Sequence, residues 1–294
     1  MLFLRTILIV LLCAPAPAAA QDDEPSILQG RIDAAADALK GEKRLERYSD
    51  ARRRDITRFV AGNLLFVLLH ELGHALITEM GLPVLGREED AADSYASVAM
   101  LRMKDQFSER VLAEAAKGWF YSDRRDRMEN IPVVFYDSHS LNSQRAYQIV
   151  CYMVGSDPEK FAALAEETGL PEERRESCLG DYSNAVWSWD RVLKDHRRTT
   201  ELKTEIAVRY GEGGAKFAIF ERFIKRVQLL EIIAQRSSDM FVWRRPFTME
   251  ARACGISHAE WNIQTRTLTI CYEMAEEFAL LYSSFGADML LSRR

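Results

Sequence analysis

The chain has 294 residues, with 39 Lys and Arg against 44 Asp and Glu, which gives a formal net charge of −5 at pH 7. A mildly acidic chain offers no electrostatic reason to expect nucleic-acid binding. The length suits one large domain or two small ones. The sequence shows no repeat at a fixed period and no long linker rich in Pro, Gly or Ser, which argues against a solenoid or a string of modules.

Residues 1–20 have the pattern of a secretory signal peptide. A basic Arg5 is followed by an apolar stretch that ends at Leu12, with small residues at Ala18 and Ala20 before the expected cleavage point at Gln21. The apolar stretch is too short to span a bilayer. Acylation of Cys13 as a lipoprotein is less favoured, because it would leave almost no apolar segment before the cleavage point. We therefore expect a secreted or periplasmic protein without a stable membrane span.

Four cysteines remain after removal of the signal peptide, namely Cys151, Cys178, Cys254 and Cys271. An even count in an oxidising compartment predicts two disulfides. Of the three possible pairings, proximity in sequence favours Cys151 with Cys178 and Cys254 with Cys271. Four buried free thiols are the alternative, and the absence of a CxxC spacing argues against a cysteine-based zinc site.

The expected elements are mostly helical. A charged N-terminal segment, 21–55, suits one or two exposed helices and precedes a single domain over 56–294. Helical spacing of apolar residues and helix-ending signals predict further helices, with a loop over 130–143. These helices cover 57–80, which ends at Gly81 and Pro83, 88 to about 117, 143–154, a short one after Asp157 and Pro158, and 170 to about 189.

One stretch alternates apolar and polar side chains as a strand does, at 262–271, and a helix follows over 272–282. The sequence therefore predicts a mainly α fold of the α+β class, with a small β element and a largely helical C-terminal half.

The motif HELGH at residues 70–74 provides the first candidate site. His70 and His74 are four residues apart, so a helix places both imidazoles on one face. With Glu71 between them, this is the HExxH arrangement of two zinc ligands and a general base. Gly73 is unfavourable inside a helix, so it is expected to leave room for the metal or for a closely approaching segment. The alternative is a polar cluster in the core, which is costly without a metal.

A third ligand is expected from the acidic start of the next helix. Glu89 can complete a His2Glu set, and Asp93, one turn later, can accept the free ring N–H of a ligand histidine. Glu88 is a competing ligand, but no acidic residue follows it at the same spacing. The alternative for these carboxylates is a solvated helix N-terminus that favours negative charge.

The apolar flank from Phe59 to Leu69 could be taken for a membrane span. Extending it to about 20 residues would place the two histidines and Glu71 in hydrocarbon, which is unfavourable. A buried core helix that positions the site is the better interpretation.

The two motifs, H70-E-L-G-H74 and E89-D-A-A-D93, resemble those of the gluzincin zinc peptidases, HExxH and ExxxD. The resemblance implies that His70, His74 and Glu89 hold Zn²⁺, that Glu71 is the base and that Asp93 orients a ligand. Gluzincins also carry a His, Tyr or Arg that stabilises the oxyanion. His139 fits that role, with Arg145 and Tyr136 as rivals, and a plain loop histidine bonded to Asp137 is the alternative.

A closer resemblance covers most of the mature chain. It is to a secreted bacterial family known as "putative metallopeptidases", through the stretches HELGHALI, REEDAADSYA, DSHSLNSQR, CLGDY and LTICYE. This resemblance implies a metal-dependent peptidase but supplies no substrate.

Two functions remain open at this stage. The first is a secreted zinc metallopeptidase with one Zn²⁺ per chain, in which Glu71 activates a zinc-bound water against a peptide or protein substrate. The alternative is an envelope binding or assembly protein with a structural zinc, in which a protein side chain such as His139 fills the fourth position. The sequence does not decide the oligomeric state.

Overall fold

A computed structural model describes residues 24–40, 43, 45–200 and 203–286. The expected signal peptide, 1–20, lies outside these described residues. Ten α-helices, one short 3-10 helix and four strands follow in chain order within them. The elements are α1 (Glu24–Ala38), α2 (Asp50–Met80), α3 (Glu88–Leu101), α4 (Gln106–Met128), α5 (Asn142–Ser156), α6 (Ala162–Glu167), α7 (Glu172–Leu193), η1 (Lys194–His196), β1 (Ile206–Tyr210), α8 (Gly214–Val227), α9 (Leu229–Met240), β2 (Phe247–Arg252), β3 (Ala259–Asn262), β4 (Thr267–Cys271) and α10 (Tyr272–Phe285).

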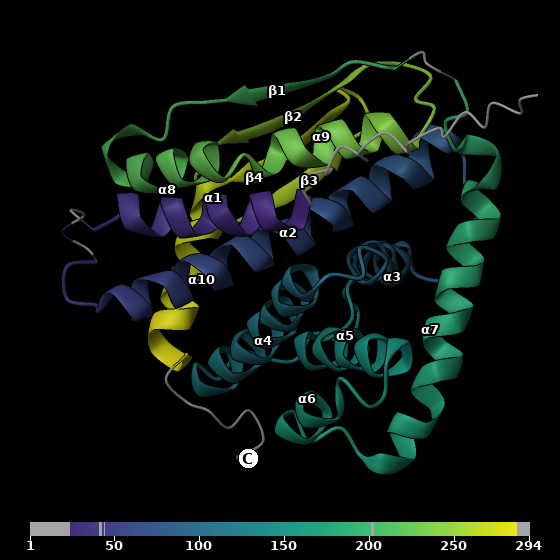
Figure 1. Cartoon of the computed structure of the whole chain (residues 1–294), viewed down its shortest axis with the longest axis horizontal. Coiled ribbons are helices and arrows are strands. Elements are labelled where there is room, and N and C mark those ends of the chain that lie inside the picture. Colours follow the sequence, from purple (N-terminus) through teal and green to yellow (C-terminus); the bar gives the residue numbers. More distant parts are fainter. Residues whose placement is uncertain (1–23, 41–42, 44, 201–202, 287–294) are drawn as a thin grey trace, which may run out of the picture.

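Helix α2 is the centre of the fold. It runs between the sheet with α8 and α9 on one side and helices α3 to α7 on the other (Figure 1). At the start of α2 the Ser49 side chain accepts a hydrogen bond from the Arg52 N–H. Gly81 ends the helix with φ of 65°, in the left-handed conformation that glycine adopts readily. By length and composition α2 could cross a membrane, but 94% of its most apolar window is buried inside the fold, as in a core helix.

The helix expected over 88–117 is in fact two helices, so that prediction is wrong. The chain turns between α3 and α4, where Lys104 adopts a positive φ of 52°. Asp105 then starts α4, because its side chain accepts the Ser108 N–H. Apolar spacing continues through the break, which explains why the periodicity alone concealed it.

Four strands form one mixed sheet in the order β1-β2-β4-β3. β1, β2 and β4 are parallel, and β3 pairs antiparallel with β4 at the edge. The strand expected over 262–271 is the second arm of this hairpin together with its turn, where the Asn262 side chain accepts the N–H groups of Gln264 and Thr265. The fold class is confirmed as mainly α with a small β element.

Two disulfides connect elements that are close in sequence. Cys151 on α5 bonds Cys178 on α7, and Cys254 bonds Cys271 at the end of β4. This is the pairing that proximity favoured, and it indicates an oxidising environment.

Removal of either bridge should destabilise the mature protein. The bridged residues are 27 and 17 positions apart, so loop-closure entropy predicts losses of about 3.5 and about 3 kcal/mol in the free energy of unfolding. Urea denaturation of the Cys151→Ala/Cys178→Ala and Cys254→Ala/Cys271→Ala variants would measure the losses. Unchanged stability in both variants would contradict the bridges.

Candidate metal centre

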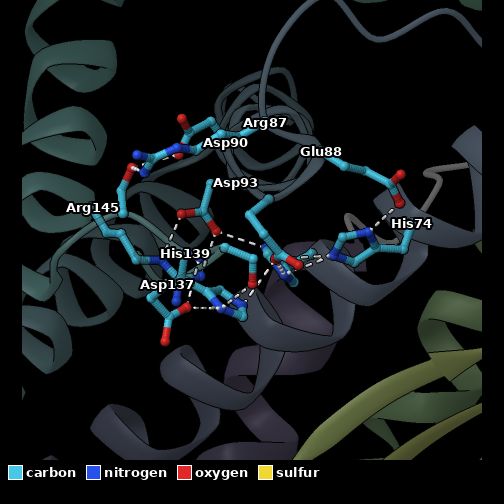
Figure 2. A network of polar contacts seen from close by, with 12 residues as sticks. His74, Arg87, Glu88, Asp90, Asp93, Asp137, His139 and Arg145 are labelled. Carbon is cyan, nitrogen blue, oxygen red and sulfur yellow. Dashed lines mark hydrogen bonds and ion pairs between the residues drawn. The ribbon is translucent and has the colours of Figure 1, made fainter. Parts of the chain in front are cut away.

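The candidate centre forms where α2 and α3 approach closely. A Cβ atom at Gly73 would lie 3.0 Å from the Cα atom of Ala92, so glycine at this position lets the two helix backbones meet. This is the second of the two roles considered for Gly73. The contact brings the face of α2 that carries His70 and His74 opposite Glu89 and Asp93 on α3. Figure 2 shows His74 pointing towards Glu88 at this junction.

Three ligand atoms lie in a nearly equilateral triangle. The Nε2 atoms of His70 and His74 are 3.1 Å apart, and each is 3.2 Å from Oε2 of Glu89. A tetrahedral ion with bonds of about 2.0–2.1 Å separates its ligand atoms by about 3.3 Å. The three side chains therefore fit an ion of the size and preferences of Zn²⁺.

Both histidines are held from behind by a carboxylate. Nδ1 of His70 lies 2.7 Å from Asp93, and Nδ1 of His74 lies 2.7 Å from Glu88. A carboxylate acceptor favours the proton on Nδ1 and leaves the lone pair of Nε2 free for a metal. Sequence reasoning weighed Glu88 only as a competing ligand, and its contact with His74 was missed because no four-residue spacing marks it.

Arg145 on α5 extends this arrangement into the core. Its Nε and Nη2 atoms each donate to a different oxygen of Asp93 at 2.7 Å, and its guanidinium lies 3.7 Å from the centre of the Trp119 ring. The pair is buried and bidentate, which is the strongest geometry for Arg and carboxylate. Arg145 thus positions Asp93, which in turn positions His70. Because Arg145 already contacts Asp93 and Trp119, it is less suited than His139 to stabilise an oxyanion.

The electrostatics of the centre favour a cation. Burial lowers the pKa of His70, but hydrogen bonds with Asp93 and Glu89 outweigh burial and raise it to about 9. Burial raises the pKa of Asp93, but Arg145 and His70 lower it to about 2. Burial also raises the pKa of Glu89, but hydrogen bonds from the surrounding histidines outweigh burial and hold this pKa well below the usual range of a glutamate. Two ionised carboxylates, Glu89 and Asp93, therefore lie beside the imidazoles, and their negative charge favours a bound cation.

Glu71 is buried beside the two histidines and keeps a higher proton affinity than an exposed glutamate. Burial raises its pKa, partly offset by the charges of His70 and His74 and by the backbone N–H of Trp261 on β3. A raised pKa suits a group that must take up and release a proton near neutral pH.

His139 reaches the centre from the loop between α4 and α5. Its Nε2 atom lies 2.9 Å from Oε2 of Glu89, and its backbone N–H donates to Asp137. Ser140 next to it donates to Asp90 on α3, which fastens the loop to the site (Figure 2). Tyr136, the other rival for the oxyanion role, is 92% exposed.

A groove opens over these residues and consists of two hollows. The Trp119 hollow, about 450 Å³, and the Trp261 hollow, about 600 Å³, share the side chains of His70, Glu71 and His139. Both also include Ala259, at the start of edge strand β3. The candidate centre is therefore open to solvent on both sides.

Replacement of Arg145 by Met should strongly destabilise the protein. It would leave the buried Asp93 carboxylate without its charge partner, which costs about 3–5 kcal/mol in free energy of unfolding. Arg102→Met is a matched control, because Arg102 forms a more exposed pair with Asp190, for which about 0–1 kcal/mol is expected. Equal losses in urea denaturation would contradict the special role of the buried pair.

Comparisons with known proteins bear on the same residues. Searches of curated proteins and of solved structures each found no match. The profile of the DUF4344 family, described as "Putative metallopeptidase", matches residues 30–193, more than half of the chain. The match includes His70, His74, Glu89, His139 and Arg145 and ends before the sheet. The chain therefore belongs to this family of proposed metallopeptidases, whose description implies a bound metal.

Proposed function

We propose that the protein is a secreted, zinc-dependent peptidase. His70, His74 and Glu89 would hold the ion, Asp93 and Glu88 would orient the two histidines, and Glu71 would act as general base. The observation that carries the proposal is the triangle of ligand atoms, with sides of 3.1, 3.2 and 3.2 Å, beside a buried glutamate that is not part of it. A purely structural zinc site would need no such glutamate.

The zinc ion, when bound, supplies a Lewis acid for the scissile carbonyl and lowers the pKa of water. The side chain of Glu71 takes the proton of the attacking water and then delivers it to the leaving nitrogen. Its raised pKa suits this role, because a carboxylate of ordinary acidity is a weaker base and takes the proton of water less readily.

His139 would stabilise the charge that develops on the carbonyl oxygen. Its hydrogen bond with Glu89 raises its pKa despite partial burial, so it can donate a proton or a hydrogen bond. It lines both hollows of the groove, on the same side as Glu89.

A peptide is the substrate that the neighbouring strand favours. The Cys271 N–H donates to the His258 carbonyl, and the antiparallel register then turns the backbone groups of Ala259 and Trp261 away from β4. Within the described residues no strand pairs with this edge of β3. Because the Trp261 N–H already bonds Glu71, an extended peptide would add to this edge through the remaining backbone groups of Ala259 and Trp261, which would hold its amides next to Glu71.

The expected signal peptide and the gluzincin motifs complete the proposal. Two disulfides are consistent with export, and HExxH followed by ExxxD supplies all three proposed ligands from two adjoining helices. The competing function, a binding protein with a structural zinc, would require a protein side chain such as His139 as the fourth ligand. The open groove around Glu71 argues for catalysis instead.

The first test replaces Glu71 by Gln in the mature protein. Loss of the base should lower kcat/KM on a mixed peptide library by about 10²–10⁴-fold, while zinc content stays at one ion per chain. Glu166→Gln, an exposed position on α6, is the matched control and should match the wild type. Metal-free wild-type protein after purification with zinc present, or undiminished hydrolysis by the Glu71→Gln variant, would contradict the proposal.

The second test separates the two roles of His139. As an oxyanion group, its replacement by Ala should lower kcat by about 10²–10³-fold, with the zinc affinity changed little. As a fourth ligand, its replacement should instead weaken zinc binding, which competition with a fluorescent chelator would measure. A large fall in zinc affinity would therefore favour the structural site.

A further inference from the structure

The Trp119 hollow carries an apolar lining next to Glu71. Its apolar side chains include Val67 on α2, Trp119 on α4, Met274 on α10, and Ile131 and Val133 in the loop before α5. Ile131 and Val133 are 47% and 57% exposed. When a ligand covers exposed apolar side chains at the rim of a concave site, apolar surface is removed from water, and this burial stabilises the complex.

The aspartates and arginines of the same lining already have partners. Every aspartate and arginine that lines the hollow has an ionic or hydrogen-bond partner in the described part of the chain: Asp123 with Arg127, Asp126 with Asn142, Asp137 with His139, and Arg145 with Asp93. A charged side chain that entered would lose part of its hydration beside groups that already have partners, whereas an apolar one would cover the exposed side chains of Ile131 and Val133.

Strand β3 leads from this hollow into the next one. Ala259 lines both hollows, while Glu260 and Trp261 line only the Trp261 hollow. An extended chain paired with β3 would therefore pass Glu71 and continue on both sides. In the described part of the chain, neither hollow forms a closed end that would accept only the terminal amino or carboxyl group of a peptide.

We propose that the Trp119 hollow is the subsite for a large apolar side chain of an extended peptide, and that the bond cleaved is an internal one next to that side chain. This inference rests on the proposed peptidase function and names its substrate class. The hollow's volume of about 450 Å³ is within the range of small-molecule sites, which reach about 300–1,000 Å³.

The test uses ten-residue peptides of Gly, Ser, Ala and Thr, blocked at both ends, with one central residue varied between Leu, Phe, Ala, Asp and Lys. Wild-type mature protein with zinc should cleave the Leu and Phe peptides with kcat/KM at least about ten-fold above the others, at a bond adjoining the varied residue. The Glu71→Gln variant should bind the same peptides in the same order, measured by fluorescence anisotropy.

Substitutions in the hollow should change this preference. Val133→Asp should reduce the ratio of Leu to Lys cleavage by at least about ten-fold. Val242→Asp is the matched control, because Val242 is 47% exposed and lies outside the groove lining, so the ratio should not change.

The possible failures are distinguishable. Equal cleavage of all five peptides, or a preference for Lys or Asp, would overturn the apolar subsite and leave the peptidase function standing. Cleavage only of peptides with a free terminus would overturn the internal bond. If no peptide of any library is hydrolysed, the proposed function fails, and equal binding of the five peptides to the Glu71→Gln variant would then also overturn the subsite.

Discussion

The close contact of Gly73 with Ala92 is the constraint on which the candidate centre depends. The helix pair has to meet backbone to backbone here, since a Cβ at residue 73 would lie 3.0 Å from the Ala92 Cα atom. At that separation the short side chain of Asp93 reaches Nδ1 of His70 at 2.7 Å. The helix propensity lost by placing glycine in mid-helix is about 1 kcal/mol, and the geometry of the centre offsets it.

The second determinant is a line of buried polar contacts from Trp119 through Arg145 and Asp93 to His70. The Trp119 ring stacks on Arg145, Arg145 pairs with Asp93, and Asp93 bonds His70. The Asp93 carboxylate can therefore lie between mostly apolar helices without being unpaired. His74 lies nearer the surface and is held by the half-exposed Glu88 instead. The two histidines are thus fixed by partners of different rigidity, with His70 the more firmly anchored.

Much of this centre could be predicted from local spacing. His70 and His74 one turn apart, and Glu89 and Asp93 one turn apart, are patterns that a helix converts directly into shared faces. Arg145 and Glu88 as partners could not be, because their contacts depend on how α5 and α3 pack, which no spacing encodes. The same limit applies to the fold: α2 was recognised from its apolar run and Gly81, whereas β1, β2 and β3 are short strands whose identity depends on pairing in the sheet.

The two halves of the molecule contribute different parts of the candidate site. The region matched by the family, 30–193, holds the proposed ligands and Arg145. The sheet lies beyond the match, yet its edge strand supplies the Trp261 N–H to Glu71 and the open backbone along the groove. A change in β3 would therefore alter how a substrate lies and how acidic Glu71 is, while the ligand triangle on α2 and α3 stayed intact. On the proposed function, substrate preference would therefore depend on a part of the chain that the family match does not cover.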